Sequence, residues 1–265
     1  MTEPVLDVGK NEEQWREYLN GYNSREARFR KMLKLLPSDP RCQLCAAPFA
    51  GLAAPVMRAM GKTKSERNPK WCNSCFSYIR EHRGGAEITA SMLFADIRGS
   101  TTMAEGMSAT DFKALLDRFY DVASQQVFDQ DGMVDKFVGD ELVAQFFPLM
   151  SGERHVARAL NAARGLLRAT GNDDPRGAWL PVGAGIHVGK IWIGTVGTGD
   201  RIELTMVGDP VNTTSRLAAA AGAGEILMST EAAAAAGLED SLPREYLELK
   251  GKSEPVEVVR VTAAQ

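Results

Sequence analysis

Residues 135–144, which read Asp-Lys-Phe-Val-Gly-Asp-Glu-Leu-Val-Ala, predict two short strands joined by a tight turn. A two-residue Gly-X turn between β-rich runs, here Gly139-Asp140, is typical of a type II′ hairpin. Such a turn would hold the Asp140 carboxylate in a rigid position, where it can bind a hard cation, and would place Lys136 on the incoming strand, where it can contact a ligand. The alternative is a solvated surface hairpin, because aspartate is common in turns. A second stretch, which supplies a matching acid, decides between the two.

Residues 93–101, Leu-Phe-Ala-Asp-Ile-Arg-Gly-Ser-Thr, predict a buried strand that ends in an acid and continues into a turn of small residues. A carboxylate at the end of a buried strand is costly unless it is paired or bound to a metal. If Asp96 and Asp140 converge, they form an oxygen site for Mg²⁺ or Mn²⁺, to which the backbone carbonyl of Ile97 can add a ligand. Two such ions can stabilise both the attacking and the leaving oxygen at phosphorus. Backbone N–H groups of the turn at 99–101 suit a polyphosphate.

Two further stretches carry polar side chains that suit a nucleotide. In residues 205–216, Thr-Met-Val-Gly-Asp-Pro-Val-Asn-Thr-Thr-Ser-Arg, the amide of Asn212 and the guanidinium of Arg216 lie four positions apart on one predicted helix face. Aimed together, they can orient a ribose and neutralise charge on a phosphoryl group. Residues 249–252, Leu-Lys-Gly-Lys, place Lys250 at a strand end, where it can hold a terminal phosphate. Taken singly, each stretch is more typical of a solvated surface, since Asn and Arg on a helix are usually solvated and Lys-Gly-Lys is usually a basic turn.

Composition favours a protein of two modules. The 265 residues are 44% hydrophobic and 25% charged, which suits a globular protein with a real core. Residues 1–85 contain 15 Lys and Arg and nine Asp and Glu, whereas the remainder carries an excess of acids. We expect a basic helical module over 1–84 and a larger module over 85–265. No apolar run approaches the roughly 18 residues of a membrane span, and the first residues do not resemble a signal peptide, so we expect a cytoplasmic protein without a membrane partner.

The four cysteines all lie in the basic module, in two CxxC pairs at Cys42, Cys45, Cys72 and Cys75. Two such pairs can present four thiolates to one tetrahedral ion, and a structural Zn²⁺ is our preferred interpretation. An iron–sulfur cluster is the main alternative, since structural disulfides do not suit a reducing compartment. The basic residues between the pairs allow a nucleic-acid-binding zinc ribbon, although a solvated basic loop explains them better.

Apolar periodicity predicts helices and strands along the whole chain. One amphipathic helix is expected over 11–36 and a short one over 76–82. In the larger module we expect helices over 108–128, 153–169 and 210–220 and a short alanine-rich helix after 228. Strands are expected over 87–95, 181–188, 190–196, 201–207, 225–228, 245–249 and 256–261, besides the hairpin. The order β-α-β-β-α-β followed by extra strands fits a ferredoxin-like α+β core.

Together the motifs Phe-Ala-Asp-Ile-Arg-Gly-Ser-Thr, the hairpin, residues 183–197, residues 205–216 and residues 249–261 resemble the catalytic domain of the class III nucleotidyl cyclases, the adenylate and guanylate cyclase family. The resemblance spans residues 87–261. It implies a ferredoxin-like cyclase core with additional C-terminal strands. It also implies two Mg²⁺ or Mn²⁺ ions on Asp96 and Asp140, one lowering the pKa of the attacking hydroxyl and one binding the triphosphate. In the family pattern, the base-selecting pair falls on Lys136 and Thr205, the transition-state pair on Asn212 and Arg216, and the triphosphate lysine on Lys250.

The base-selecting pair favours ATP as substrate. Lys136 can donate to N1 of adenine, and the Thr205 hydroxyl can accept from the 6-amino group, whereas a guanine reader would need an acid. Threonine stands where many adenylate cyclases have aspartate, so selection against GTP is expected to be looser.

The resemblance further implies a head-to-tail homodimer, in which Asp96 and Asp140 of one subunit meet Lys136, Thr205, Asn212 and Arg216 of its partner. We therefore expect an adenylate cyclase that forms cyclic AMP and pyrophosphate and is regulated by the N-terminal module. The alternatives are a catalytically silent cyclase fold that binds nucleotide and a zinc-dependent nucleic-acid-binding protein.

Overall fold

The structure, a computed structural model, describes residues 11–21, 24–36, 40–197, 202–238, 242–248 and 254–264. The chain divides into two compact units. Residues 1–88 together with 192–206 form one unit, called here the cysteine unit, and residues 89–191 together with 207–265 form the other, called here the sheet unit. The predicted boundary between an N-terminal module over 1–84 and a larger module over 85–265 stays a prediction.

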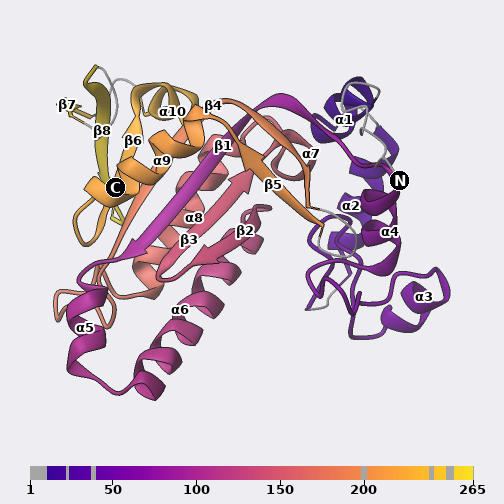
Figure 1. Cartoon of the computed structure of the whole chain (residues 1–265), viewed down its shortest axis with the longest axis horizontal. Coiled ribbons are helices and arrows are strands. Elements are labelled where there is room, and N and C mark those ends of the chain that lie inside the picture. Colours follow the sequence, from indigo (N-terminus) through magenta and orange to yellow (C-terminus); the bar gives the residue numbers. More distant parts are fainter. Residues whose placement is uncertain are drawn as a thin grey trace, which may run out of the picture. The chain divides into compact units, whose positions relative to one another are not determined.

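One mixed sheet organises the fold, and its strands lie in the order β2-β3-β1-β4-β6-β8-β7, with β5 paired to β4 (Figure 1). Its first four strands and the helices α6 and α8 form the predicted ferredoxin-like βαββαβ core, and β6, β8 and β7 extend it. The strands are β1 (Gly85–Ile97), β2 (Met133–Val138), β3 (Glu141–Phe146), β4 (Val182–Val196), β5 (Glu203–Val207), β6 (Glu225–Ser229), β7 (Arg244–Leu247) and β8 (Val256–Thr262). The helices of the sheet unit are α5 (Ser100–Gly106), α6 (Ala109–Asp129), α7 (Pro148–Ser151), α8 (His155–Ala169), α9 (Asp209–Ala220) and α10 (Thr230–Ala235).

Alternation along the strands separates the two faces of the sheet. Leu93 and Ala95 of β1 and Leu142 of β3 are fully buried in the core cluster that α6 and α8 build. Asp96, one residue on from Ala95, therefore points to the opposite face. There α9 packs, and the Thr214 hydroxyl of α9 lies 3.7 Å from the sulfur of Met92 on β1.

Two glycines of β4 allow α9 to lie directly on the sheet. A Cβ on Gly185 would lie 2.3 Å from the backbone nitrogen of Ala218 and 2.7 Å from the carbonyl oxygen of Thr214. A Cβ on Gly183 would lie 2.8 Å from the carbonyl oxygen of Ala221. These contacts are closer than a side chain tolerates, so the position of α9 depends on glycine in β4.

The predicted hairpin and helix start are confirmed. Gly139 has φ of 61°, while Asp140 has no positive φ, which is the pattern of a type II′ turn between β2 and β3. Ser108 caps α6 by accepting a hydrogen bond of 3.1 Å from the backbone N–H of Asp111.

The described residues of the cysteine unit form the short helices α1 (Glu12–Leu19), α2 (Ser24–Lys34), α3 (Ala54–Ala59) and α4 (Asn73–Glu81). Buried Trp15 of α1 donates a hydrogen bond of 3.0 Å to the carbonyl of His82, just beyond α4. The carbonyl of Gly84 then accepts a hydrogen bond from the backbone N–H of Thr195, and the backbone N–H of Gly84 donates to the Thr195 hydroxyl. No helix among the described residues is both long and apolar enough to cross a membrane.

Several predicted elements were wrong in extent. The single helix expected over 11–36 is broken after α1, where Gly21 adopts φ of 70° and ends the helix. The two strands expected on either side of Gly189 are one continuous strand, β4, because that glycine stays extended. The turn expected at 99–101 is the start of α5, after Gly99 in a left-handed conformation. Helices α3 and α7 were not predicted.

Candidate functional site

Three carboxylates meet where β1 ends and the hairpin turns. Asp96 is the penultimate residue of β1, and Glu141, the first residue of β3, is its partner across the two antiparallel strands. Asp140 occupies the hairpin turn and lies within hydrogen-bonding reach of Asp96. All three side chains are only partly exposed. The structure thus brings together the two acids that the sequence predicted and adds a third.

Burial and mutual proximity raise the pKa of two of these carboxyl groups. Burial, the hydrogen bond with Asp140 and the charge of Asp140 raise the pKa of Asp96 to about 6, although the nearby Arg98 opposes the shift. Burial and the charges of Asp96 and Asp140 raise the pKa of Glu141 to about 7. Like charges in a partly desolvated place resist ionisation, and a bound cation relieves that repulsion.

Arg98 links the acid cluster to α9. Its guanidinium forms an ion pair with Asp96 and donates to the carbonyls of Ala219, at 3.1 Å, and Ala221, at 3.3 Å. A second link runs from Glu141, which is hydrogen-bonded to Ser215 in the middle of α9. The helix that carries Asn212 and the strand that carries Asp96 are therefore held together by side chains.

On α9, Asn212 is exposed and Arg216 is half-buried, one turn apart on the same helix. Within the described ranges, neither side chain makes a hydrogen bond or ion pair. The structure does not join them to Asp96 or Asp140 in the same chain. Their predicted role in the site of a partner subunit stays a prediction.

Lys136 and Thr205 lie in different units. Lys136 is exposed on β2, with its ammonium 3.8 Å from the Asp135 carboxylate. The register of β2 against β3 shifts between Val134 and Lys136, and such a bulge re-aims the side chain that follows it. Thr205 is buried in the middle of β5.

Of the two remaining predicted site residues, Ile97 and Lys250, the structure describes only the first. Ile97 ends β1 with its side chain buried, and its backbone follows Asp96 directly. Lys250 lies outside the described residues.

The four cysteines converge in the cysteine unit, with their sulfur atoms all within 4.8 Å of one another. The sulfurs of Cys45 and Cys72 are 3.8 Å apart, and the backbone N–H of Cys72 donates to the sulfur of Cys42 at 3.2 Å. Zn–S bonds of about 2.3 Å in a tetrahedron separate sulfurs by about 3.8 Å. The thiolates of an iron–sulfur cluster ligate different irons and stand farther apart. The arrangement therefore fits a single tetrahedral ion better than a cluster.

Side chains from outside the two CxxC turns, called here knuckles, hold this geometry. Buried Arg30 of α2 donates at 2.7 Å to the carbonyls of both Gln43 and Leu44, the residues between the first two cysteines. The ammonium of Lys62 lies 4.0 Å from the sulfur of Cys45, so a cation faces the thiolates. Arginine and lysine at these places orient the knuckle and offset its negative charge.

Sequence reasoning missed Glu141 and Arg98 as members of the acid cluster. Glu141 could have been found from the alternation of β3, because Leu142 faces the core and its neighbour must face the other side. The contacts of Arg98 with α9 had no local signal, because its partners lie more than 120 positions along the chain.

Comparison with known proteins identifies the family to which these residues belong. Residues 86–260 match the family described as the adenylate and guanylate cyclase catalytic domain. This chain belongs to the class III adenylate and guanylate cyclases. The matched residues run from β1 to β8 and include the acid cluster and α9, while the four cysteines precede them.

Solved cyclases of both nucleotide classes resemble the chain. The adenylyl cyclase CyaB from P. aeruginosa is 28% identical, with a TM-score of 0.58 over 67% of this chain and 95% of that one. The guanylyl cyclase Cya2 is 26% identical, with a TM-score of 0.60 over 67% and 93%. The two likenesses are too similar to distinguish an ATP-specific cyclase from a GTP-specific one.

Curated relatives include the uncharacterized protein Rv1318c of Mycobacterium tuberculosis, which is 32% identical over 187 residues, 68% of this chain and 34% of the relative. The uncharacterized protein Rv1319c of the same organism is 35% identical over 138 residues, 52% of this chain and 25% of the relative. The matching part of the chain thus spans about a third or a quarter of these relatives.

Proposed function

We propose that the protein is an adenylate cyclase, which converts ATP to 3′,5′-cyclic AMP and pyrophosphate. In this reaction the 3′-hydroxyl oxygen bonds to the α-phosphorus, the bond from that phosphorus to the bridging oxygen of the pyrophosphate breaks, and the hydroxyl proton is lost. The observation that carries the proposal is the meeting of Asp96 and Asp140 at the end of β1, in a chain of the cyclase family.

Asp96, Asp140 and the carbonyl of Ile97 would hold the divalent cations, Mg²⁺ or Mn²⁺. The residues fit such ions, because the donors are oxygens and the carboxyl groups repel one another without a cation. When bound, the ions would supply positive charge to the triphosphate and to the attacking hydroxyl. Arg98 would keep the Asp96 carboxylate oriented, and Lys250 would hold the triphosphate.

Lys136 and Thr205 would read the base. Lys136 donates to N1 of adenine and Thr205 accepts from the 6-amino group, which favours ATP over GTP. Asn212 would orient the ribose, and Arg216 would neutralise charge that develops on the α-phosphate.

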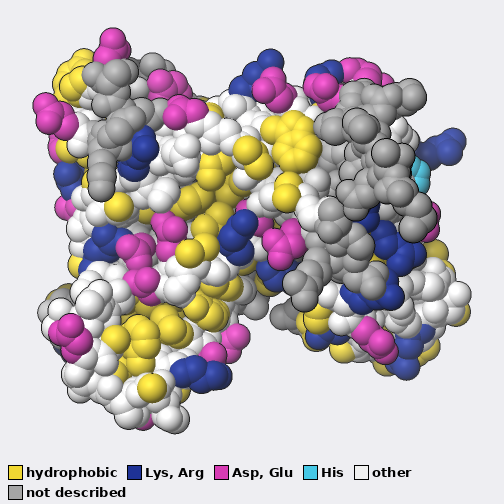
Figure 2. All heavy atoms as spheres, viewed as in Figure 1, with side chains coloured by type: hydrophobic (Ala, Val, Ile, Leu, Met, Phe, Trp, Pro, Cys, Tyr) yellow, Lys and Arg dark blue, Asp and Glu magenta, His cyan; other side chains and the backbone are white. Residues whose placement is uncertain are grey.

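A homodimer would assemble the complete site, with Asp96 and Asp140 from one subunit and Lys136, Thr205, Asn212 and Arg216 from its partner. In Figure 2, hydrophobic side chains gather over β1, β2 and β3 on the sheet face that α6 and α8 leave open. Val138 and Val207 are 55% and 54% exposed in the single chain. Such an apolar face suits burial against a second copy of the chain.

The decisive assay compares ATP and GTP with the purified protein, in Mg²⁺ and in Mn²⁺. We expect cyclic AMP from ATP and a slower conversion of GTP. The similarity to a guanylyl cyclase makes GTP the second candidate substrate, and a faster formation of cyclic GMP would overturn the proposed role of Lys136 and Thr205. Absence of both products would support a catalytically silent fold.

Manganese binding is expected to weaken as the pH falls. A proton must leave Asp96 before the carboxylate can bind a cation, and with a pKa of about 6 the apparent affinity should drop about tenfold per pH unit below that value for each proton displaced. Titration of Mn²⁺ followed by electron paramagnetic resonance from pH 8 to pH 5 measures this. In Glu141→Gln, the change in Mn²⁺ affinity near pH 7 should be lost, because the group with a pKa of about 7 has been removed. A flat affinity over this range would contradict the expectation.

The four cysteines would hold one structural Zn²⁺, through which the N-terminal region sets the dimer geometry and regulates activity. Cys72→Ser is expected to lose zinc, as measured by elemental analysis, and to unfold the cysteine unit in thermal melts, because removing one of four ligands opens a closed site. Ser74→Ala, on the same turn but outside the sulfur cluster, is the control and should retain one zinc per chain. Iron in place of zinc would contradict the assignment.

A further inference from the structure

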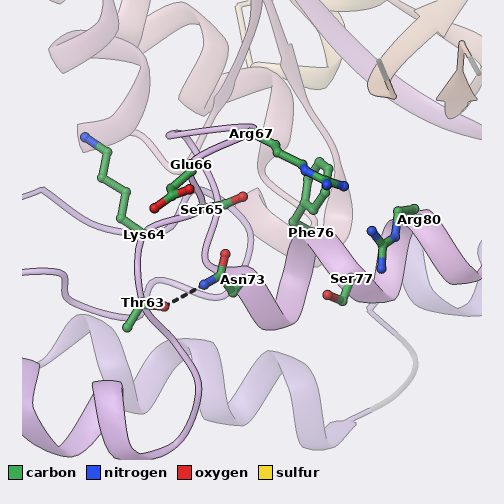
Figure 3. Close-up of a pocket in the computed structure, with 9 residues that line it drawn as sticks. All are labelled: Thr63, Lys64, Ser65, Glu66, Arg67, Asn73, Phe76, Ser77 and Arg80. Atoms are coloured by element: carbon green, nitrogen blue, oxygen red, sulfur yellow. Dashed lines mark hydrogen bonds between the residues drawn. The ribbon is translucent and has the colours of Figure 1, made fainter. Parts of the chain in front are cut away.

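A pocket of about 530 Å³ lies in the cysteine unit, between residues 63–67 and one face of α4 (Figure 3). From α4 it is lined by Asn73, Phe76, Ser77 and Arg80. Spacings of three and four place these side chains on the same side of the helix. The volume is within the range of pockets that bind small molecules.

The lining of this pocket is predominantly basic. Lys64, Arg67 and Arg80 contribute three positive charges, and Glu66 contributes one negative charge. In the part of the chain that the structure describes, neither Lys64 nor Arg80 forms an ion pair. Figure 2 also shows Lys and Arg side chains gathered on the surface of the cysteine unit. An anion would therefore meet two cations, Lys64 and Arg80, that form no ion pair with another described residue.

The remaining lining residues offer neutral polar groups and a flat apolar wall. Thr63 accepts a hydrogen bond of 2.7 Å from the side-chain amide of Asn73, and the hydroxyl of Ser77 lies further along α4 (Figure 3). Phe76, which is only 5% exposed, supplies the aromatic part of the lining. Hydroxyl, amide and forked guanidinium donors match the several oxygens of a phosphate.

We propose that this pocket binds a small phosphorylated molecule, separate from the nucleotide of the cyclase site. Recognition would rest on Lys64, Arg67 and Arg80. The shared chemistry is a di- or polyanionic phosphate, which an inorganic pyrophosphate or a nucleotide can supply.

Binding would act on the turns that carry the cysteines. Asn73 lies between Cys72 and Cys75 and its backbone N–H donates to the carbonyl of Thr63 at 2.8 Å. Lys64 forms a β-bridge with Cys72. A ligand that draws residues 63–67 toward α4 therefore contacts the segments that present two of the four thiolates, and the pocket depends on an intact cysteine site.

The test is isothermal titration of the full chain with inorganic pyrophosphate and, separately, with AMP, without added Mg²⁺ or Mn²⁺. The pocket is expected to bind at least one of the two probes at one saturable site per chain. In the double variant Lys64→Glu with Arg80→Glu, affinity should fall at least tenfold. The matched control is Lys31→Glu with Arg58→Glu, which reverses two exposed cations of the same unit outside the pocket and should change affinity less than twofold.

Three results would overturn the proposal. The first is that neither probe binds at a saturable site, and the second is that the two charge-reversal pairs weaken binding of the probes equally. The third is that an oligonucleotide binds more tightly than both probes and that both charge-reversal pairs weaken its binding equally. The conservative pair Lys64→Arg with Arg80→Lys should retain binding, and unchanged zinc content and melting temperature show that a variant is folded. Pyrophosphate is also a product of the proposed cyclase reaction, so binding is assigned to the pocket by its loss in Lys64→Glu with Arg80→Glu, and this loss does not depend on cyclase activity. Stronger binding of AMP than of pyrophosphate would identify a nucleotide as the ligand, and the reverse would identify an inorganic phosphate.

Discussion

Replacing Asp140 with asparagine is expected to reduce cyclic AMP formation on the order of a thousandfold or more. The carboxylate lies beside Asp96 at the hairpin turn, where the two acids would hold the divalent cations. Loss of one charged ligand removes several kcal/mol of stabilisation of the charge that develops at phosphorus. Initial rates with ATP in saturating Mn²⁺ measure the effect, and Asp96→Asn should behave in the same way.

Asp121→Asn is the matched control for this experiment. Asp121 is an exposed acid on α6, the helix on the opposite face of the sheet. Its neutralisation changes the net charge equally and should leave the rate within about twofold. Removing an acid whose neighbours repel it should not destabilise the fold, so a melting temperature at or above that of the wild type is expected for Asp140→Asn. A cyclase that keeps its rate after either site substitution does not use these acids.

Replacing Gly185 with alanine is expected to have the second largest effect, although this residue would touch neither substrate nor cation. The new Cβ would lie 2.3 Å from the backbone nitrogen of Ala218 and 2.7 Å from the carbonyl of Thr214, so α9 must move away from β4. Overpacking of this kind costs about 1–3 kcal/mol of unfolding free energy. The same movement displaces Asn212 and Arg216, and a shift of about 1 Å can cost on the order of a hundredfold in rate.

Urea unfolding and steady-state rates separate the two consequences of this substitution. Gly106→Ala is the control, because a Cβ there meets nothing within 4 Å and the residue lies at the end of α5. It should be neutral or slightly stabilising, since alanine favours a helix over glycine. A Gly185→Ala protein with wild-type stability and rate would show that α9 does not depend on this close approach.

Short-range signals explain which parts of the fold could be predicted. The turn at Gly139 needs a positive φ, and Ser108 offers a cap three residues before Asp111, so both features follow from a few adjacent residues. The four cysteines were predictable for the same reason, because each CxxC pair forms a local knuckle. These predictions did not depend on how distant segments pack.

Two of the wrong predictions concern glycines that the sequence alone assigns to the wrong conformation. Gly189 looks like a strand break, yet it stays extended within β4. Gly21 looks tolerable within an apolar helical stripe, yet it adopts a left-handed conformation that separates α1 from α2. Residue type alone does not determine whether a glycine continues or interrupts an element.

The acid cluster was only half predictable for a related reason. Asp96 and Asp140 follow from motifs, whereas the inclusion of Glu141 depends on the register of β3 against β1. Arg98 joins through carbonyls at the end of α9, which no local pattern in the sequence specifies. The chemistry of the site was readable from the sequence, but its supporting contacts needed the fold.

The most direct test of an active site shared between two subunits mixes two inactive chains. Asp140→Asn removes an acid and Arg216→Ala removes the guanidinium, so each homodimer should be inactive toward ATP. In a heterodimer purified through two different tags, one site would combine both substitutions and the other would be intact. We predict about half of the wild-type rate of cyclic AMP formation per dimer. A purified heterodimer as inactive as its parents would contradict a site shared between two subunits.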